Sequence, residues 1–248
     1  QMVPGLLLFY GLVALIAALM WERSGASGWA AFALAGGIFG WLIEGVVVNQ
    51  TYEAVPFSLV WTALAWHMVL SVLVGVVGLA WALSRGLWQA CAVALGLGVF
   101  AGLWGAYGWT QLPEDVAGGQ GMSFALQITL ASAMMALGHF LLGRVPSGPT
   151  PAWLLWGLVG IAALVWALAW AVPHAPVSGA VPILIGVSVL ALRRMGRGQP
   201  APIWGPIPTR RLVAFALIPP VAIPVQALIV DASWVAEINV FVALPLPI

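Results

Sequence analysis

Long apolar runs separated by short polar segments make up almost the whole chain. The hydrocarbon layer of a membrane is about 30 Å thick, and a helix needs roughly 20 apolar residues to cross it. Eight runs reach this length, at residues 3–21, 29–48, 57–83, 87–108, 122–143, 152–172, 176–192 and 212–230. Because apolar and polar residues do not alternate as in barrel strands, the pattern predicts an all-α, polytopic membrane helical bundle of about eight transmembrane helices, forming a single domain over residues 1–248. The tail, residues 232–248, is apolar enough for a ninth helix but short.

Composition excludes a water-soluble fold and several kinds of chemistry. The chain is 63% hydrophobic and 6% charged, with a mean hydropathy of +1.08 and 15 tryptophans, which is typical of a membrane protein. It contains no lysine, so it cannot form a Schiff base with retinal or pyridoxal phosphate and lacks the lysine of a Walker-A loop. Its one cysteine, Cys91, cannot form an internal disulfide.

Arginines mark alternate loops and thereby predict the orientation of the chain. Arg23, Arg85 and Arg144 follow the first, third and fifth runs, and five more arginines lie in residues 193–211. The positive-inside rule places these loops in the cytoplasm and the start of the first run on the outer side. We therefore expect a protein integral to the cytoplasmic (inner) membrane of a bacterial-type cell.

The Arg-rich segment 193–211 also contains repeated proline, and two interpretations of it compete. It could dock on anionic lipid headgroups or an acidic partner, or it could be an extended linker whose charge only sets the topology. The expected partners of the protein are membrane lipids and other membrane subunits. Nucleic acid is not expected, because no recognition motif accompanies the basic residues.

One carboxylate lies inside an apolar run. Glu44 is about one and a half helical turns below the outer end of run 29–48. Gly36, Gly40 and Glu44 are spaced at i, i+4 and i+8, so they share one helix face that a neighbouring helix can approach closely. Because charged groups within a span are costly in lipid, we expect Glu44 to face protein.

The next run offers a matching face, formed by His67, Ser71 and Gly75 at the same spacing. If the two runs are antiparallel, the Glu44 and His67 backbones differ in depth by about 8 Å, which two side chains or one water could bridge. The pair could handle a proton or polarise a ligand, or it could be a hydrogen bond that fixes helix packing. For the functional interpretation, the further candidate ligand-binding residues are Tyr52, Glu53, Trp61, Trp66 and Gln226.

The remaining sequence features are weaker indications of a functional site. The last run contains Pro219, Pro220 and Pro224, so it is expected to be kinked or broken, and Gln226 could be a polar neighbour of that break. Gly98 and Gly102 predict another close helix contact. Haem ligation by His67 and His139 is not favoured, because their depths differ by about 10 Å. No group of residues indicates a metal site.

Three classes of function remain open. The sequence favours a non-catalytic subunit of a membrane assembly or a binding protein for a hydrophobic ligand or pigment, because these need no catalytic residues. One alternative is an intramembrane enzyme acting on a lipid or isoprenoid, with Glu44 and His67 as an acid–base pair. A second alternative is a proton-coupled transporter of a small solute, with Glu44 as the coupling acid.

Overall fold

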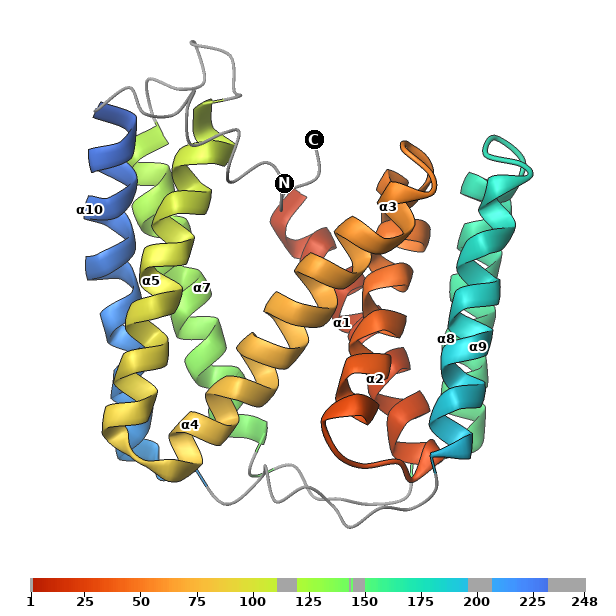
Figure 1. The fold of residues 1–248 in the computed structure, drawn as a ribbon, viewed down its shortest axis with the longest axis horizontal. Coiled ribbons are helices and arrows are strands. Elements are labelled where there is room, and N and C mark those ends of the chain that lie inside the picture. The colour runs from red at the N-terminus through yellow and green to blue at the C-terminus, as the bar shows by residue number, and fades with distance from the viewer. Residues whose placement is uncertain (1, 111–119, 143, 145–149, 196–206, 232–248) are drawn as a thin grey trace. The chain divides into compact units, whose positions relative to one another are not determined.

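The computed structural model describes residues 2–110, 120–142, 144, 150–195 and 207–231, and every secondary structure element in them is a helix (Figure 1). This confirms the all-α prediction. In chain order the elements are α1 (Met2–Ser24), α2 (Trp29–Leu42), η1 (Ile43–Val47), η2 (Gln50–Tyr52), α3 (Phe57–Val60), η3 (Trp61–Gly78), α4 (Leu79–Arg85), α5 (Leu87–Thr110), α7 (Gln120–Leu142), α8 (Ala152–Trp166), η4 (Ala167–Ala171), η5 (Val177–Gly179), α9 (Ala180–Arg194), η6 (Thr209–Leu217) and α10 (Ile218–Asp231).

Seven helical runs among the described residues are long and apolar enough to cross a membrane, and they follow the second to eighth predicted spans. They are Trp29–Val47, Phe57–Arg85, Leu87–Ala106, Phe124–Leu142, Ala152–Ala171, Val177–Arg194 and Thr209–Asp231. The first predicted span corresponds to helix α1. Large apolar side chains such as Leu164 and Leu168 are exposed on these helices. The seven apolar helices are consistent with a membrane-embedded protein, while the count of eight and the orientation stay predictions.

Two parts of the sequence predictions lie outside the described residues. The possible ninth helix, residues 232–248, is one of them, and most of the Arg-rich segment 193–211 is the other.

The helices group into two compact units within the chain. Unit 1 contains α1 to η3 together with α8 to α9, and unit 2 contains α4 to α7 together with η6 and α10.

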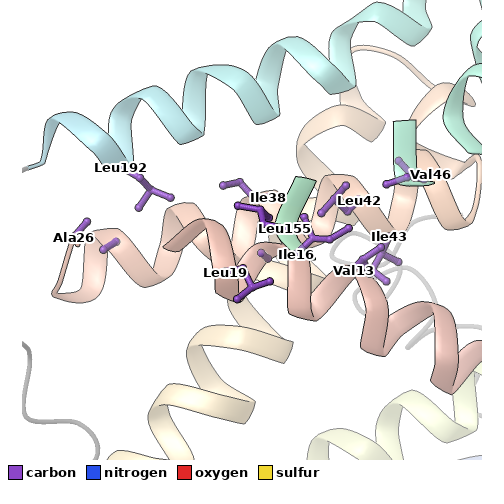
Figure 2. Close-up of a cluster of buried hydrophobic side chains, with 13 residues drawn as sticks. Val13, Ile16, Leu19, Ala26, Ile38, Leu42, Ile43, Val46, Leu155 and Leu192 are labelled. Atoms are coloured by element: carbon purple, nitrogen blue, oxygen red, sulfur yellow. The ribbon is translucent and has the colours of Figure 1, made fainter. Parts of the chain in front are cut away.

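Unit 1 is held together by a buried apolar cluster to which α1, α2, η1, α8 and α9 contribute (Figure 2). Ile16, Ile38 and Leu192 are fully buried in it. In a membrane the lipid tails are as apolar as these side chains, so close packing rather than exclusion of water stabilises such a cluster. Leu192 therefore anchors the last turn of α9, which carries Arg193 and Arg194.

In unit 2, two glycines of α5 let α10 approach closely. A Cβ atom at Gly98 would lie 2.8 Å from the Val221 side chain, and one at Gly102 would lie 2.6 Å from the Ala222 carbonyl oxygen. The last predicted span is divided into η6, which has tighter 3₁₀-type turns, and α10. Pro219 and Pro220, which lack a backbone N–H, fall in the first turn of α10, directly after η6.

Two turns of unit 1 are built alike although they lie 120 residues apart. Ser58 and Ser178 each follow a cis proline by two residues. Each serine hydroxyl donates to the carbonyl oxygen seven residues earlier, at Thr51 (2.7 Å) and Ala171 (3.0 Å). The helical hairpins α2 to η3 and α8 to α9 therefore share one kind of turn. The second hairpin has no Asp, Glu, Lys or Arg between residues 152 and 192, so a hairpin of this type does not require an ionisable pair.

Candidate functional site

The structure brings Glu44 and His67 into direct contact. Glu44 lies in η1, where the helix widens to π-type turns, and it is only 5% exposed. Its Oε1 atom lies 2.6 Å from Nε2 of His67 on η3. This short distance is typical of a hydrogen bond in which one partner is ionised. The two groups can therefore form an ion pair, or a neutral pair with one proton in the bond between them.

Glycines of α2 allow this contact. A Cβ atom at Gly40 would overlap the carbonyl oxygen of Ala63, and one at Gly36 would lie 3.1 Å from Cα of Met68. The backbones of α2 and η3 therefore touch on the helix face that Gly36 and Gly40 share, and Glu44 follows one turn later. His67 reaches the carboxylate because η3 lies directly against that face.

The helix-packing role predicted for Ser71 and Gly75 on the third span stays a prediction. Residues Trp61–Gly78 form wide, π-type turns, so the i, i+4, i+8 rule for an α-helix does not identify their shared face. Ser71 is exposed, and its hydroxyl donates to the Trp66 carbonyl oxygen of its own helix (3.4 Å). A Cβ atom at Gly75 would meet only the Leu70 carbonyl oxygen, also of η3. The atoms nearest to a Cβ position at Gly36 or Gly40 belong to Met68, Val72 and Ala63.

Two aromatic rings that the sequence did not single out contact His67. Phe39 and Tyr10 stand edge-on to the imidazole, with ring centroids 5.6 and 6.1 Å away. Tyr10 comes from α1, so three helical segments meet at the pair. Phe39 directly precedes Gly40 in the sequence, so its position near the pair could have been predicted. Tyr10 could not be placed without knowing how α1 packs.

The outer atoms of the pair are buried and have no protein partner among the described residues. These atoms are Oε2 of Glu44 and Nδ1 of His67. Buried polar atoms in proteins are nearly always hydrogen-bonded to protein or to ordered water. A water molecule, a proton or a small polar group bound at these two atoms would satisfy them, which makes the pair the strongest candidate for chemistry in unit 1.

The other predicted ligand-binding residues lie elsewhere. Trp61 stacks on Phe57, with ring centroids 5.3 Å apart. Trp66 is half-buried on η3, and Glu53 is exposed in the turn. Gln226 is buried on α10 and belongs to unit 2. Their roles as ligand-binding residues stay predictions.

Tyr52 joins the two similar turns rather than the Glu44–His67 pair. Its hydroxyl donates to the Gly45 carbonyl oxygen (2.7 Å) and accepts from Nε1 of Trp166 (3.1 Å). Its ring stacks on His174 at 4.9 Å. Burial raises the pKa of Tyr52 from 10.0 to about 12, and the hydrogen bond from Trp166 opposes this rise.

Tyr52→Phe should therefore lower the stability of the folded protein by about 2 kcal/mol at neutral pH, because it removes two hydrogen bonds that contribute about 1 kcal/mol each. Because the folded pKa lies above the unfolded one, this contribution is complete below pH 10 and is lost as the pH rises to about 12. Thermal unfolding of both proteins at a series of pH values measures the difference. It should shrink above pH 10, and a difference that stays constant up to pH 12 contradicts the assignment.

Unit 1 also contains an apolar groove of about 500 Å³ along α8 and α9. We call it the α8–α9 groove. It is lined by Ile16 and Met20 of α1, Leu42 of α2, Val46 of η1, Trp156, Val159, Ala162, Ala163 and Trp166 of α8, and Val181, Pro182, Ile185, Gly186, Val189, Leu190 and Arg193 of α9.

The groove has the size and lining of a ligand site. Its volume falls within the roughly 300–1,000 Å³ of small-molecule sites in proteins, which are mostly apolar with a few polar groups. From Val181 to Arg193 it follows α9 for about 18 Å, more than half the thickness of a hydrocarbon layer. Arg193 is the one charged residue of its lining. The sequence could not predict this groove, because α1 and α2 lie more than 100 residues before α8 and α9.

No family model, curated protein or solved structure matches the chain. The two candidate sites are therefore interpreted from their own geometry. The Glu44–His67 pair has buried polar atoms without a protein partner among the described residues, and it does not line the α8–α9 groove. The α8–α9 groove has such space but only one charged group. The two features favour different functions.

Proposed function

We propose that the chain is an integral membrane protein that binds an apolar, chain-like ligand in the α8–α9 groove, without catalytic chemistry of its own. The single observation that carries the proposal is the groove itself, with its volume of about 500 Å³ and its apolar lining. Such a protein could act alone or as a subunit of a membrane assembly. The start of the first span is expected outside the cytoplasm, and the Arg-rich segment inside.

The shape of the groove supports a chain rather than a globular ligand. Its floor consists of buried side chains, including Ile16, Leu42 and Val181. Its walls include Trp156 and Leu190, which are 61% and 54% exposed. A groove that is long, apolar and open along its side fits one hydrocarbon chain entering from the surrounding lipid. Each buried CH₂ group contributes about 0.8 kcal/mol relative to water, but relative to lipid only the closer packing contributes.

Gly186→Phe tests this proposal. A Cβ atom at Gly186 would meet no atom within 4 Å, so the phenyl ring can enter the groove without displacing the backbone. Gly157→Phe is the matched control, because Gly157 lies on α8, also has free space around its Cβ position and does not line the groove. Native mass spectrometry of the protein, released gently from lipid nanodiscs, measures the retained lipid.

We expect the wild type and Gly157→Phe to retain lipid, and Gly186→Phe to retain several-fold less. If all three proteins retain the same amount, or if the wild type retains none, the groove is not a ligand site. Thermal unfolding of both variants serves as a check that the added ring has not disrupted packing.

The Glu44–His67 pair supports a second candidate function, the uptake and release of a proton. Two observations favour it: the outer atoms Oε2 and Nδ1 are buried without a protein partner, and the similar hairpin α8 to α9 exists without such a pair. A buried acid next to an imidazole is suited to exchange a proton in either direction. Glu44→Gln keeps the shape and removes the acid. Infrared spectroscopy measures the carboxyl band of the protein as a function of pH. A band that changes with pH in the wild type and is lost in Glu44→Gln supports this function. A wild-type band that does not change with pH contradicts it.

A further inference from the structure

Arg193 is placed to recognise the head of whatever chain occupies the α8–α9 groove. It lines the groove at the end of α9. Leu192, its neighbour, is fully buried in the core of unit 1, so the point from which the Arg193 side chain extends is held firmly. The side chain is exposed, and it takes part in none of the hydrogen bonds or ion pairs found among the described residues. Its guanidinium is therefore available to a ligand.

The chemistry at this end of the groove selects an anion. An arginine guanidinium presents several N–H donors in a planar fork that matches a phosphate group. The lining includes no carboxylate that would neutralise Arg193. The adjacent Arg194 adds a second positive charge, although it lines a separate surface depression with Val187 and Met195. The predicted orientation places both arginines at the cytoplasmic face, where anionic headgroups attract basic side chains.

We propose that the α8–α9 groove binds one acyl chain of an anionic phospholipid whose phosphate group binds the Arg193 guanidinium. The proposal rests on the ligand-binding function of the groove and adds the chemical class of the ligand. The apolar lining accounts for the chain, and the single cation at one end accounts for the head. A zwitterionic lipid fills the same groove but carries a positive group that Arg193 repels.

Competition between two lipids tests the proposal. Wild type, Arg193→Gln and Arg194→Gln are placed in nanodiscs containing equal amounts of phosphatidylglycerol and phosphatidylcholine, and native mass spectrometry measures the ratio of the two lipids that stay bound. Both substitutions remove one positive charge at adjacent positions, but only Arg193 lines the groove. Since Arg193 is exposed, its substitution should leave thermal stability unchanged.

We expect the wild type and Arg194→Gln to prefer phosphatidylglycerol, and Arg193→Gln to lose about fivefold of that preference, which corresponds to about 1 kcal/mol. If the wild type binds both lipids equally, or if the two arginine variants lose the same preference, the headgroup assignment is overturned. Gly186→Phe tests lipid binding in the groove separately from the headgroup preference. A wild type that retains lipid without headgroup preference, and loses it in Gly186→Phe, keeps the ligand-binding function and rejects only the preference for an anionic headgroup.

Discussion

Gly40→Ala is expected to destabilise unit 1 by about 3 kcal/mol, at the upper end of the usual cost of overpacking. The added methyl group would overlap the carbonyl oxygen of Ala63 and lie 2.8 Å from its carbonyl carbon. These are backbone atoms, so no side-chain rotation can relieve the overlap, and α2 and η3 must separate. The measurement is thermal unfolding in detergent, where a loss of this size lowers the midpoint by about 6–12 °C.

Gly160→Ala is the matched control for Gly40→Ala. Gly160 stands at the position of α8 that corresponds to Gly40 when the two similar turns are superposed in sequence, and a Cβ atom there would meet nothing within 4 Å. Alanine in an exposed helix interior is better than glycine by up to about 1 kcal/mol. The control should therefore be neutral or slightly more stable. Equal behaviour of the two variants would show that α2 and η3 do not touch at Gly40.

Replacing one member of the Glu44–His67 pair by leucine should cause the second large loss of stability. Glu44→Leu leaves both ring nitrogens of His67 without a partner, and His67→Leu leaves the carboxylate buried and alone. Loss of one partner of a buried polar pair costs about 3 kcal/mol. Replacing both partners by leucine should recover most of this loss, because an apolar pair leaves no buried group unsatisfied.

The same double variant separates the two interpretations of the pair. Thermal unfolding of the two single variants and of the double variant measures the coupling between the residues. If the pair only fixes helix packing, the double variant should restore stability together with every activity of the protein. If the pair handles a proton, stability returns but proton-dependent activity does not, because neither leucine can exchange a proton. A double variant as unstable as both single variants would contradict the contact itself.

The sequence predicted the helices well because membrane insertion imposes a simple rule on length and polarity. The runs 57–83 and 87–108, for example, correspond to Phe57–Arg85 and Leu87–Ala106. Counting residues inward from the turn also placed the Glu44 and His67 backbones about 8 Å apart in depth, a gap that their side chains could bridge. The helix face assigned to Ser71 and Gly75 stays a prediction, because the counting assumed α-helical turns, whereas the turns of η3 are wider.

Other parts of the candidate sites depend on contacts between distant segments. Tyr10 reaches His67 from α1, and the groove needs α8 and α9 to lie against α1 and α2. No spacing rule within one helix contains this information. The similarity of the two turns was present in the sequence as a proline followed two residues later by serine, at Pro56 and Pro176. It becomes meaningful only with the matching hydrogen bonds of Ser58 and Ser178.

The most direct test of lipid binding is a cryo-EM map of the protein in nanodiscs formed from its own membrane lipids. We expect elongated density in the α8–α9 groove, extending along Gly186 and ending in a headgroup next to the Arg193 guanidinium. A groove closed by direct packing of α8 against α9, or filled by protein side chains, would contradict the proposed function.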